Sequence, residues 1–366
     1  MRSTDVIKEA QRVMTICNAC RYCEGFCAVY PAMELRKTFS EQDLKYLTNL
    51  CHNCRGCYYA CQYAPPHEFA VNVPKTFAEL RLELYAHFAW PDFCAGLFRF
   101  NGLWVAMITT LSVAVVVALT FVFQKPAVVF STHVGENAFY KVIPYWLMVL
   151  LFSALATYVL AILLKEGLRF WRETGGTLSE LADLHAHARA IWDALRLKYL
   201  DGGGYGCNYP DDRFGMVRRW FHHLVFYGFM LCFAATTVAA IYHHFLHRSA
   251  PYPFWSWPVI LGTVGGLALL MGTGGLLYLK RQMDTAPATS RSLGMDVGFL
   301  ALLFLTSLTG GLLLISRETP ALVIMLAIHL GVIGGLFITM PYSKFVHAIY
   351  RYLALVRNAI EQLRAE

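Results

Sequence analysis

The chain has 366 residues, of which 57% are hydrophobic and only 15% are charged. Soluble proteins contain about 25% charged residues, so this composition excludes an ordinary soluble enzyme. The formal net charge is +7. The basic residues follow the expected membrane topology described below, so the charge gives no reason to predict nucleic-acid binding.

The first 61 residues contain the spacing C-x2-C-x2-C-x3-C twice. Bacterial two-cluster ferredoxins use this spacing, and the fourth cysteine of each run binds the other cluster. The pattern therefore predicts two 4Fe-4S clusters. The predicted ligands of the first cluster are Cys17, Cys20, Cys23 and Cys61. The predicted ligands of the second cluster are Cys51, Cys54, Cys57 and Cys27.

Two other uses of these cysteines fit the sequence less well. Structural zinc sites usually combine separated C-x2-C pairs, whereas here four cysteines lie within eleven residues. Disulfides would need an oxidising compartment, and the charged, polar residues 1–10 do not form a signal peptide. One departure from the ferredoxin pattern is that Ala28 and Gln62 replace the proline that often follows the fourth cysteine. We expect the cysteine domain, residues 1–75, to lie in the cytoplasm.

Residues 76–101 are expected to connect this domain to the membrane. The stretch 77–88 is amphipathic, and the aromatic segment 89–93 follows it. This pattern favours a helix that lies on the bilayer surface and docks the cysteine domain there.

Six apolar stretches follow, each of about 20 residues and therefore long enough to cross a bilayer as a helix. They lie at residues 103–123, 142–164, 220–245, 258–279, 294–315 and 321–341. Glycine pairs such as Gly265–Gly266 and Gly334–Gly335 would permit neighbouring helices to approach closely. We assign residues 102–350 to the transmembrane domain and residues 351–366 to a cytoplasmic tail.

Lysine and arginine are unevenly divided between the two sides of the membrane. With the cysteine domain inside, most of them fall in the cytoplasmic segments 165–219, 280–291 and 344–364. The opposite side carries only Lys125, Lys141, Arg248 and Arg317. This bias obeys the positive-inside rule, and an even number of spans places both termini in the cytoplasm.

The cytoplasmic loop 165–219 is longer than a simple connection. Apolar periodicity predicts a helix over 177–200, with Thr177 and Glu180 in capping-box spacing. The glycine-rich segment 201–210 follows no strand and is not a phosphate-binding fingerprint. We expect it to form a turn that covers a redox site. Three cysteines outside any ligand spacing are interpreted as packing residues: Cys94, Cys207 and Cys232.

Histidines in or beside the apolar spans suggest a second cofactor, because polar side chains there need a partner. The third span begins with His222 and His223 and ends with His243 and His244. His329 lies within the sixth span, and His347 follows eighteen residues later. His329 and His347 would share one face if the helix continued past Pro341.

Spans three and six run in opposite directions, so their histidines fall at two matching depths. This arrangement suits two stacked b-type haems, each with axial ligands from facing helices. The inner candidates are His347 with His222 or His223. Adjacent residues point about 100° apart on a helix, so only one of these two can bind, and we choose His223. The outer candidates are His329 with His243 or His244. A proton relay through His329 and interface roles for His243 and His244 remain open alternatives.

These features together resemble the tricarballylate-utilisation protein B family, also named citrate-utilisation protein B. The resemblance rests on the double cysteine motif and on segments 218–229 and 340–347. The membrane half resembles, more distantly, the cytochrome b subunits of respiratory nitrate and heterodisulfide reductases. The implied fold is mainly α, with a bacterial-ferredoxin-like two-cluster domain followed by a six-helix bundle of cytochrome b type in the bacterial cytoplasmic membrane.

The resemblance also implies a partner, a soluble FAD-dependent tricarballylate dehydrogenase that forms cis-aconitate. This chain would reoxidise the partner's flavin and pass electrons through two 4Fe-4S clusters and one or two b haems to membrane quinone. No nucleotide fingerprint, nucleophile elbow or carboxylate pair indicates a substrate dehydrogenation site of its own. The alternatives are a quinol-oxidising anchor for a soluble reductase, and a redox-sensing membrane protein or transporter, which the scarcity of acids in the spans disfavours.

Overall fold

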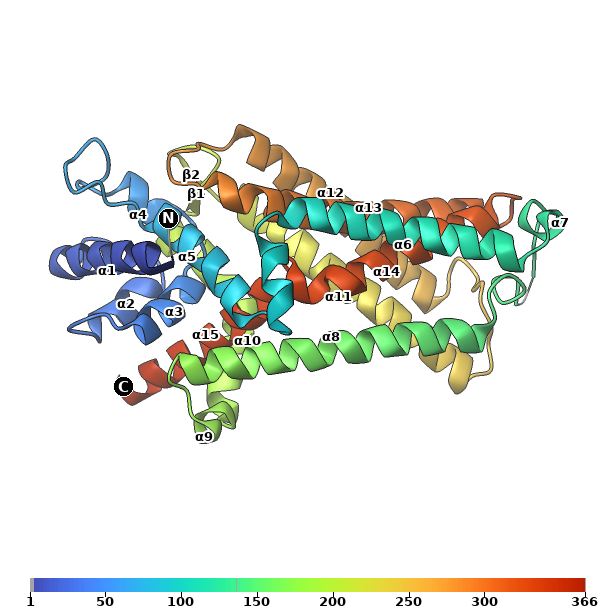
Figure 1. Cartoon of the computed structure of the whole chain (residues 1–366), viewed down its shortest axis with the longest axis horizontal. Helices are drawn as coiled ribbons and strands as arrows, with labels where there is room; N and C mark the ends of the chain where they lie inside the picture. The colour runs from blue at the N-terminus through green and yellow to red at the C-terminus, as the bar shows by residue number, and fades with distance from the viewer. Residues whose placement is uncertain (1–2, 136, 366) are drawn as a thin grey trace.

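The computed structural model describes residues 3–135 and 137–365 and is mainly α-helical. Short helices at one end of the molecule carry the cysteines, and long helices extend from them to the other end, where α7 (Pro126–Val129) lies (Figure 1). The N- and C-termini both lie at the cysteine-bearing end (Figure 1). The sequence therefore predicted a mainly α fold and the order of its two parts correctly, and the cytochrome b type of the bundle stays a prediction.

The N-terminal region consists of five helices around one apolar core. They are α1 (Ser3–Cys20), α2 (Val29–Glu34), α3 (Glu41–Leu50), α4 (Gly56–Tyr59) and α5 (Val73–Phe88). The helix α3 starts with a capping box, in which Ser40 and Asp43 satisfy each other's backbone N–H groups. The fully buried side chains of Leu44, Leu47 and Phe77 fix α3 against α5.

The helix that the sequence predicts on the bilayer surface is α5. In the structure, α5 is instead buried among other helices. It begins at Val73, four residues before the predicted start, with Pro74 in its first turn. Eleven of its sixteen residues are buried, so both of its faces are covered. It packs against α1 and α3 and also meets α13 (Ser290–Ser316). The 3-10 helix η1 (Asp92–Phe98) then leads to the first long helix.

Six helices in the described part of the chain are long and apolar enough to cross a membrane, as predicted. They are α6 (Asn101–Phe123), α8 (Tyr145–Glu173), α11 (Val217–His244), α12 (Trp257–Gln282), α13 (Ser290–Ser316) and α14 (Leu322–Thr339). Glycines let pairs of them touch. A Cβ on Gly265 would lie 2.8 Å from the carbonyl oxygen of Gly228 in α11, and one on Gly335 would lie 2.7 Å from Thr109 in α6.

The loop between α8 and α11 folds against the N-terminal region. The predicted single helix over 177–200 is two helices, α9 (Leu178–Leu181) and α10 (Leu184–Leu195). The break occurs because the Asp183 carboxylate accepts bonds from the first backbone N–H groups of α10. The predicted capping box of Thr177 and Glu180 is present. The loop continues through η2 (Lys198–Leu200), η3 (Gly202–Gly204), β1 (Cys207–Asn208) and β2 (Phe214–Gly215), and the two strands pair antiparallel.

The chain does not continue as one helix past Pro341. A 3-10 turn, η4 (Met340–Tyr342), separates α14 from the last helix, α15 (Val346–Ala365). Proline removes a backbone donor and clashes with the preceding turn, which explains the break. His329 and His347 therefore do not share one helical face.

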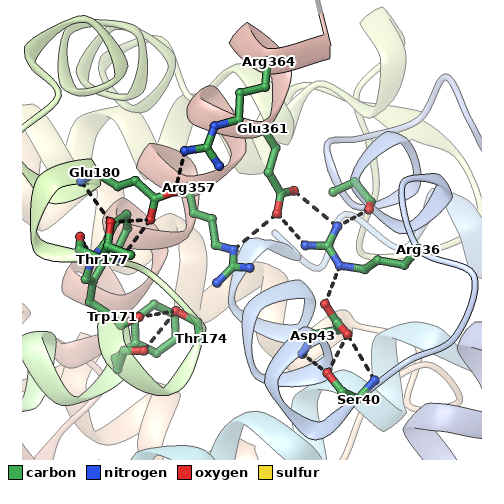
Figure 2. Close-up of polar contacts among 12 residues, drawn as sticks. Arg36, Ser40, Asp43, Trp171, Thr174, Thr177, Glu180, Arg357, Glu361 and Arg364 are labelled. Atoms are coloured by element: carbon green, nitrogen blue, oxygen red, sulfur yellow. Dashed lines mark hydrogen bonds and ion pairs between the residues drawn. The ribbon is translucent and has the colours of Figure 1, made fainter.

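The last helix ties the two parts of the molecule together. The Arg36 guanidinium, just after α2, lies 2.6 Å from Asp43 and 2.5 Å from Glu361 of α15 (Figure 2). Farther along α15, Arg364 lies 2.6 Å from Glu180 of α9 (Figure 2). The C-terminal segment thus packs against the cysteine-bearing end of the molecule and is not a free tail.

Candidate redox site

The cysteines predicted for the first cluster line one cavity, whose volume is about 260 Å³. We call Cys17, Cys20, Cys23 and Cys61 the first cysteine set. Cys17 and Cys20 lie in the last turn of α1, which ends where Arg21 adopts a left-handed backbone conformation with φ of 56°. Cys23 lies in the turn that follows, and Cys61 comes two residues after α4. Cys57 also lines this cavity.

The other four cysteines surround a smaller space of about 10 Å³. We call Cys27, Cys51, Cys54 and Cys57 the second cysteine set. Cys51 caps the C-terminus of α3, Cys57 belongs to α4, and Cys27 precedes α2. Each set thus contains three cysteines of one motif and the fourth cysteine of the other. Which of them bind iron stays a prediction.

The two sets differ in their access to solvent. Beside the first set, the Tyr22 side chain is 71% exposed. In the second set, Cys51 and Cys54 are 7% and 5% exposed. The second set is covered by the segment 201–209, whose Asn208 N–H donates to the carbonyl oxygen of Cys54 at 3.0 Å. We call residues 201–209 the covering segment.

Burial also determines the protonation of the thiols. Burial, together with smaller effects of neighbouring thiols, raises the pKa of Cys17 and of Cys54 to about 12. These two thiols are therefore protonated at neutral pH when no metal is bound. Iron binds the thiolate, so binding at either set must release protons, and the positive charge of the metal must offset the desolvation of the thiolates.

Tyr30 is a site residue that the sequence analysis missed. It lines both spaces and is 2% exposed, and its hydroxyl lies within hydrogen-bonding reach of the Cys23 and Cys57 thiols, one from each set. Burial raises its pKa well above the ordinary value, and charge on Cys57 or Cys23 would raise it further. The hydroxyl therefore stays protonated and can donate a hydrogen bond to a group held by either set. Its only sequence signal is its position three residues after Cys27.

Of the inner histidine candidates, the structure brings His222 close to His347. The sequence analysis had chosen His223 for this position. The ring centroids of His222 and His347 lie 6.5 Å apart, with the two ring planes at 76° to each other. Nδ1 of His347 lies 2.5 Å from the carbonyl oxygen of Lys344. His223 instead stacks on Tyr227, with ring centroids 5.8 Å apart.

The outer candidates are not brought together. Nδ1 of His329 lies 2.9 Å from the Thr309 hydroxyl of α13. His243 stacks on Tyr145 at 3.7 Å between ring centroids, and the Tyr145 hydroxyl lies 2.8 Å from Nε2 of His244. No ring contact or hydrogen bond within residues 3–135 and 137–365 joins His329 to either of them. These histidines have protein partners from other helices.

The remaining cysteines lie outside both sets. Cys207 is buried in the covering segment, where its thiol donates to the carbonyl oxygen of Leu200 at 3.3 Å. Cys94 is buried in η1, and Cys232 is half-buried in α11.

Comparisons with known proteins agree with this two-part organisation. Residues 10–87 match the family model described as citrate utilization protein B Fer4-like domain, and residues 99–366 match that of citrate utilization protein B. The citrate utilization protein B of Escherichia coli is 48% identical over 364 residues, which cover 99% of this chain and 94% of the relative. No solved structure matches. The chain therefore belongs to the citrate utilization protein B family, and its N-terminal region is a Fer4-like domain.

Proposed function

We propose that this protein is a membrane electron carrier that reoxidises the flavin of a soluble dehydrogenase and delivers the electrons to membrane quinone. The observation that carries the proposal is the order of the sites. All four cysteines of the first set are partly exposed, whereas Cys51 and Cys54 of the second set are buried. The loop of the second set shares its neighbours Arg218 and Arg351 with the His222–His347 pair. A donor in solution can approach the first set, and the second set leads toward the long apolar helices.

The residues present fit two 4Fe-4S clusters. Each set offers four thiols around its own space, in the spacing that binds cubanes in ferredoxins. Cys17, Cys20, Cys23 and Cys61 would hold one cluster, and Cys27, Cys51, Cys54 and Cys57 the other. When bound, the clusters supply one-electron acceptors and donors, which a two-electron flavin requires. The covering segment would keep water from the second site.

A b-type haem between His222 and His347 belongs to the same proposal. Metal-binding histidines commonly donate one ring N–H to a backbone carbonyl and bind through the other nitrogen. The contact of His347 Nδ1 with Lys344 has this form and leaves Nε2 for a metal. We limit the proposal to this inner haem, since the outer candidates already have other partners.

The partner and the orientation are proposed on the basis of family and charge. The relative is named for citrate utilisation, and the family resemblance points to a soluble FAD-dependent tricarballylate dehydrogenase as the electron donor. The concentration of arginine and lysine on the cysteine-bearing side supports a cytoplasmic position for both termini. The donor would then bind from the cytoplasm.

The cofactors can be tested on anaerobically purified protein. We expect iron, acid-labile sulfide and paired b-haem absorbance bands that sharpen on reduction with dithionite. His347→Leu should lose the haem. His223→Leu is the matched control, because the neighbouring ring faces Tyr227, and it should keep the haem. Equal haem content in the two variants would contradict the His222–His347 pair.

The direction of electron flow needs a separate test. Purified protein is mixed with the flavoenzyme, tricarballylate and a soluble quinone analogue under anaerobic conditions. We expect reduction of the quinone that depends on all three components. Cluster reduction by quinol, without any quinone reduction from the flavoenzyme, would instead assign the protein to the quinol-oxidising class.

A further inference from the structure

Three arginines from separate helices reach the backbone that carries the second cysteine set. They are Arg81 of α5, Arg218 of α11 and Arg351 of α15, and we call them the arginine collar. Arg81 and Arg351 each donate to the carbonyl oxygen of Cys51 at 2.8 Å. Arg218 donates to the carbonyl oxygen of Asn53 at 2.6 Å. Three positive charges therefore converge on one short loop.

The collar lacks a protein counter-charge. Within residues 3–135 and 137–365, none of the three guanidinium groups lies within 4.0 Å of a carboxylate oxygen. The nearby carboxylate of Asp296 is already held by Lys280 at 2.6 Å and Lys344 at 2.8 Å. Buried unpaired charges are strongly unfavourable. Arg81 is only 5% exposed, so a missing negative charge is expected close by.

The collar also has unused hydrogen-bond donors. The Nε atoms of Arg81 and Arg351 are buried and have no partner in the described structure. Among the residues that the structure describes, the first cysteine set has no such group of buried arginines: Arg21, which donates to the carbonyl oxygen of Asn18, is exposed. The two sites therefore differ in local charge although they share one cysteine spacing.

We propose that the arginine collar raises the reduction potential of the cluster held by the second cysteine set above that of the first. This inference rests on the proposed function, since it requires both clusters. A cluster gains negative charge on reduction, so fixed positive charge in a buried, low-dielectric site favours the reduced form. Arg81, Arg218 and Arg351 are positioning residues that act through the loop 51–54. They make transfer from the open site to the enclosed site favourable.

The test is a redox titration of both clusters followed by electron paramagnetic resonance. The two signals are assigned with the Cys20→Ser and Cys54→Ser proteins. In Arg351→Gln, the reduced-to-oxidised ratio of the second cluster at fixed potential should fall at least tenfold, which equals 59 mV for a one-electron couple. The first cluster should not move. Arg351→Lys keeps the charge and should shift the ratio less.

Arg317→Gln is the matched control, because Arg317 is also buried and donates to a carbonyl oxygen, that of Tyr252, far from the collar. It should leave both potentials unchanged. If Arg351→Gln loses the second cluster, the same titration is made on Arg218→Gln, and an unshifted potential there overturns the inference.

The remaining outcomes are also decisive. If Arg351→Gln shifts only the reduction potential of the haem, the inference is overturned. The collar would then be assigned to binding the haem carboxylates. Unchanged potentials in a protein with both clusters would overturn it as well. A protein without iron and sulfide would instead refute the proposed function.

Discussion

The two cysteine sets repeat one motif, yet their surroundings differ in space, solvent and charge. The first set borders a cavity of about 260 Å³ beside an exposed tyrosine, Tyr22. The second borders about 10 Å³, and its loop is contacted by the covering segment at the carbonyl of Cys54 and by the arginine collar at the carbonyls of Cys51 and Asn53. A ligand motif therefore specifies which cofactor can bind, and the residues packed around it set how that cofactor behaves.

The largest expected difference follows from removing one ligand in each site. Cys20→Ser and Cys54→Ser should each lose about half of the iron and sulfide. Cys54→Ser should also lower the unfolding temperature further, because loss of the cluster loosens the loop to which Asn208 ties the covering segment. Iron analysis and thermal unfolding of the anaerobic proteins check this. If Cys20→Ser and Cys54→Ser unfold at the same temperature, the covering segment over the second cysteine set does not contribute to the stability of the fold.

The covering segment can be disrupted with less damage. Gly206 has φ of +105°, and a Cβ there would lie 2.5 Å from the backbone of Gly215. Gly206→Ala should destabilise the protein by about 1–3 kcal/mol and speed the loss of the second cluster in air. Gly204→Ala is the control, since φ is +106° but the Cβ enters open space. If both variants lose the cluster at one rate, the clash plays no part.

The link between α15 and the N-terminal region tests how the cysteine domain is held. Arg36→Ala breaks partly buried bonds to Asp43 and Glu361 and should cost about 1–3 kcal/mol of stability. Arg364→Ala breaks an exposed pair with Glu180 and should cost about 0.2–1 kcal/mol. Denaturant unfolding measures both values. A larger effect for Arg364 would contradict this ranking.

The stability that the contacts of Arg36 with Asp43 and Glu361 contribute should depend on pH. Burial acts to raise the pKa of Asp43, but hydrogen bonds from Ser40 and Arg36 outweigh it and hold the pKa below the ordinary value. The stabilisation is therefore complete above the pKa of an unfolded aspartate, about 3.9, and is lost as pH falls through the lower folded pKa. Asp43→Asn should flatten the acid limb of the stability curve. An unchanged acid limb would exclude Asp43 as its source.

The smallest effect is expected from a cysteine outside both sets. Cys232 lies half-buried in α11, so Cys232→Ser should leave the iron and sulfide content unchanged. Metal analysis of the purified variant checks this. Any loss of iron would mean that the two sets do not account for all the ligands.

Local patterns in the sequence predicted much of this fold. Six apolar stretches became six long helices, and the capping box at Thr177 formed as expected. The errors occurred where a single side chain or a distant contact competes with periodicity. Asp183 splits the helix predicted at 177–200, Pro341 ends α14, and packing from two sides buries α5. Helix periodicity shows that one face of a helix is apolar. It does not show what packs against that face.

By itself, the sequence determined the repeated cysteine spacing and the six long apolar helices, because both depend on residues close together in the chain. Only the tertiary structure decided that His222 and not His223 faces His347, and that the second cysteine set is the enclosed one. Arg351 reaches the carbonyl of Cys51 across 300 positions in the chain. Such a contact depends on the packing of separate helices, and no local pattern encodes it.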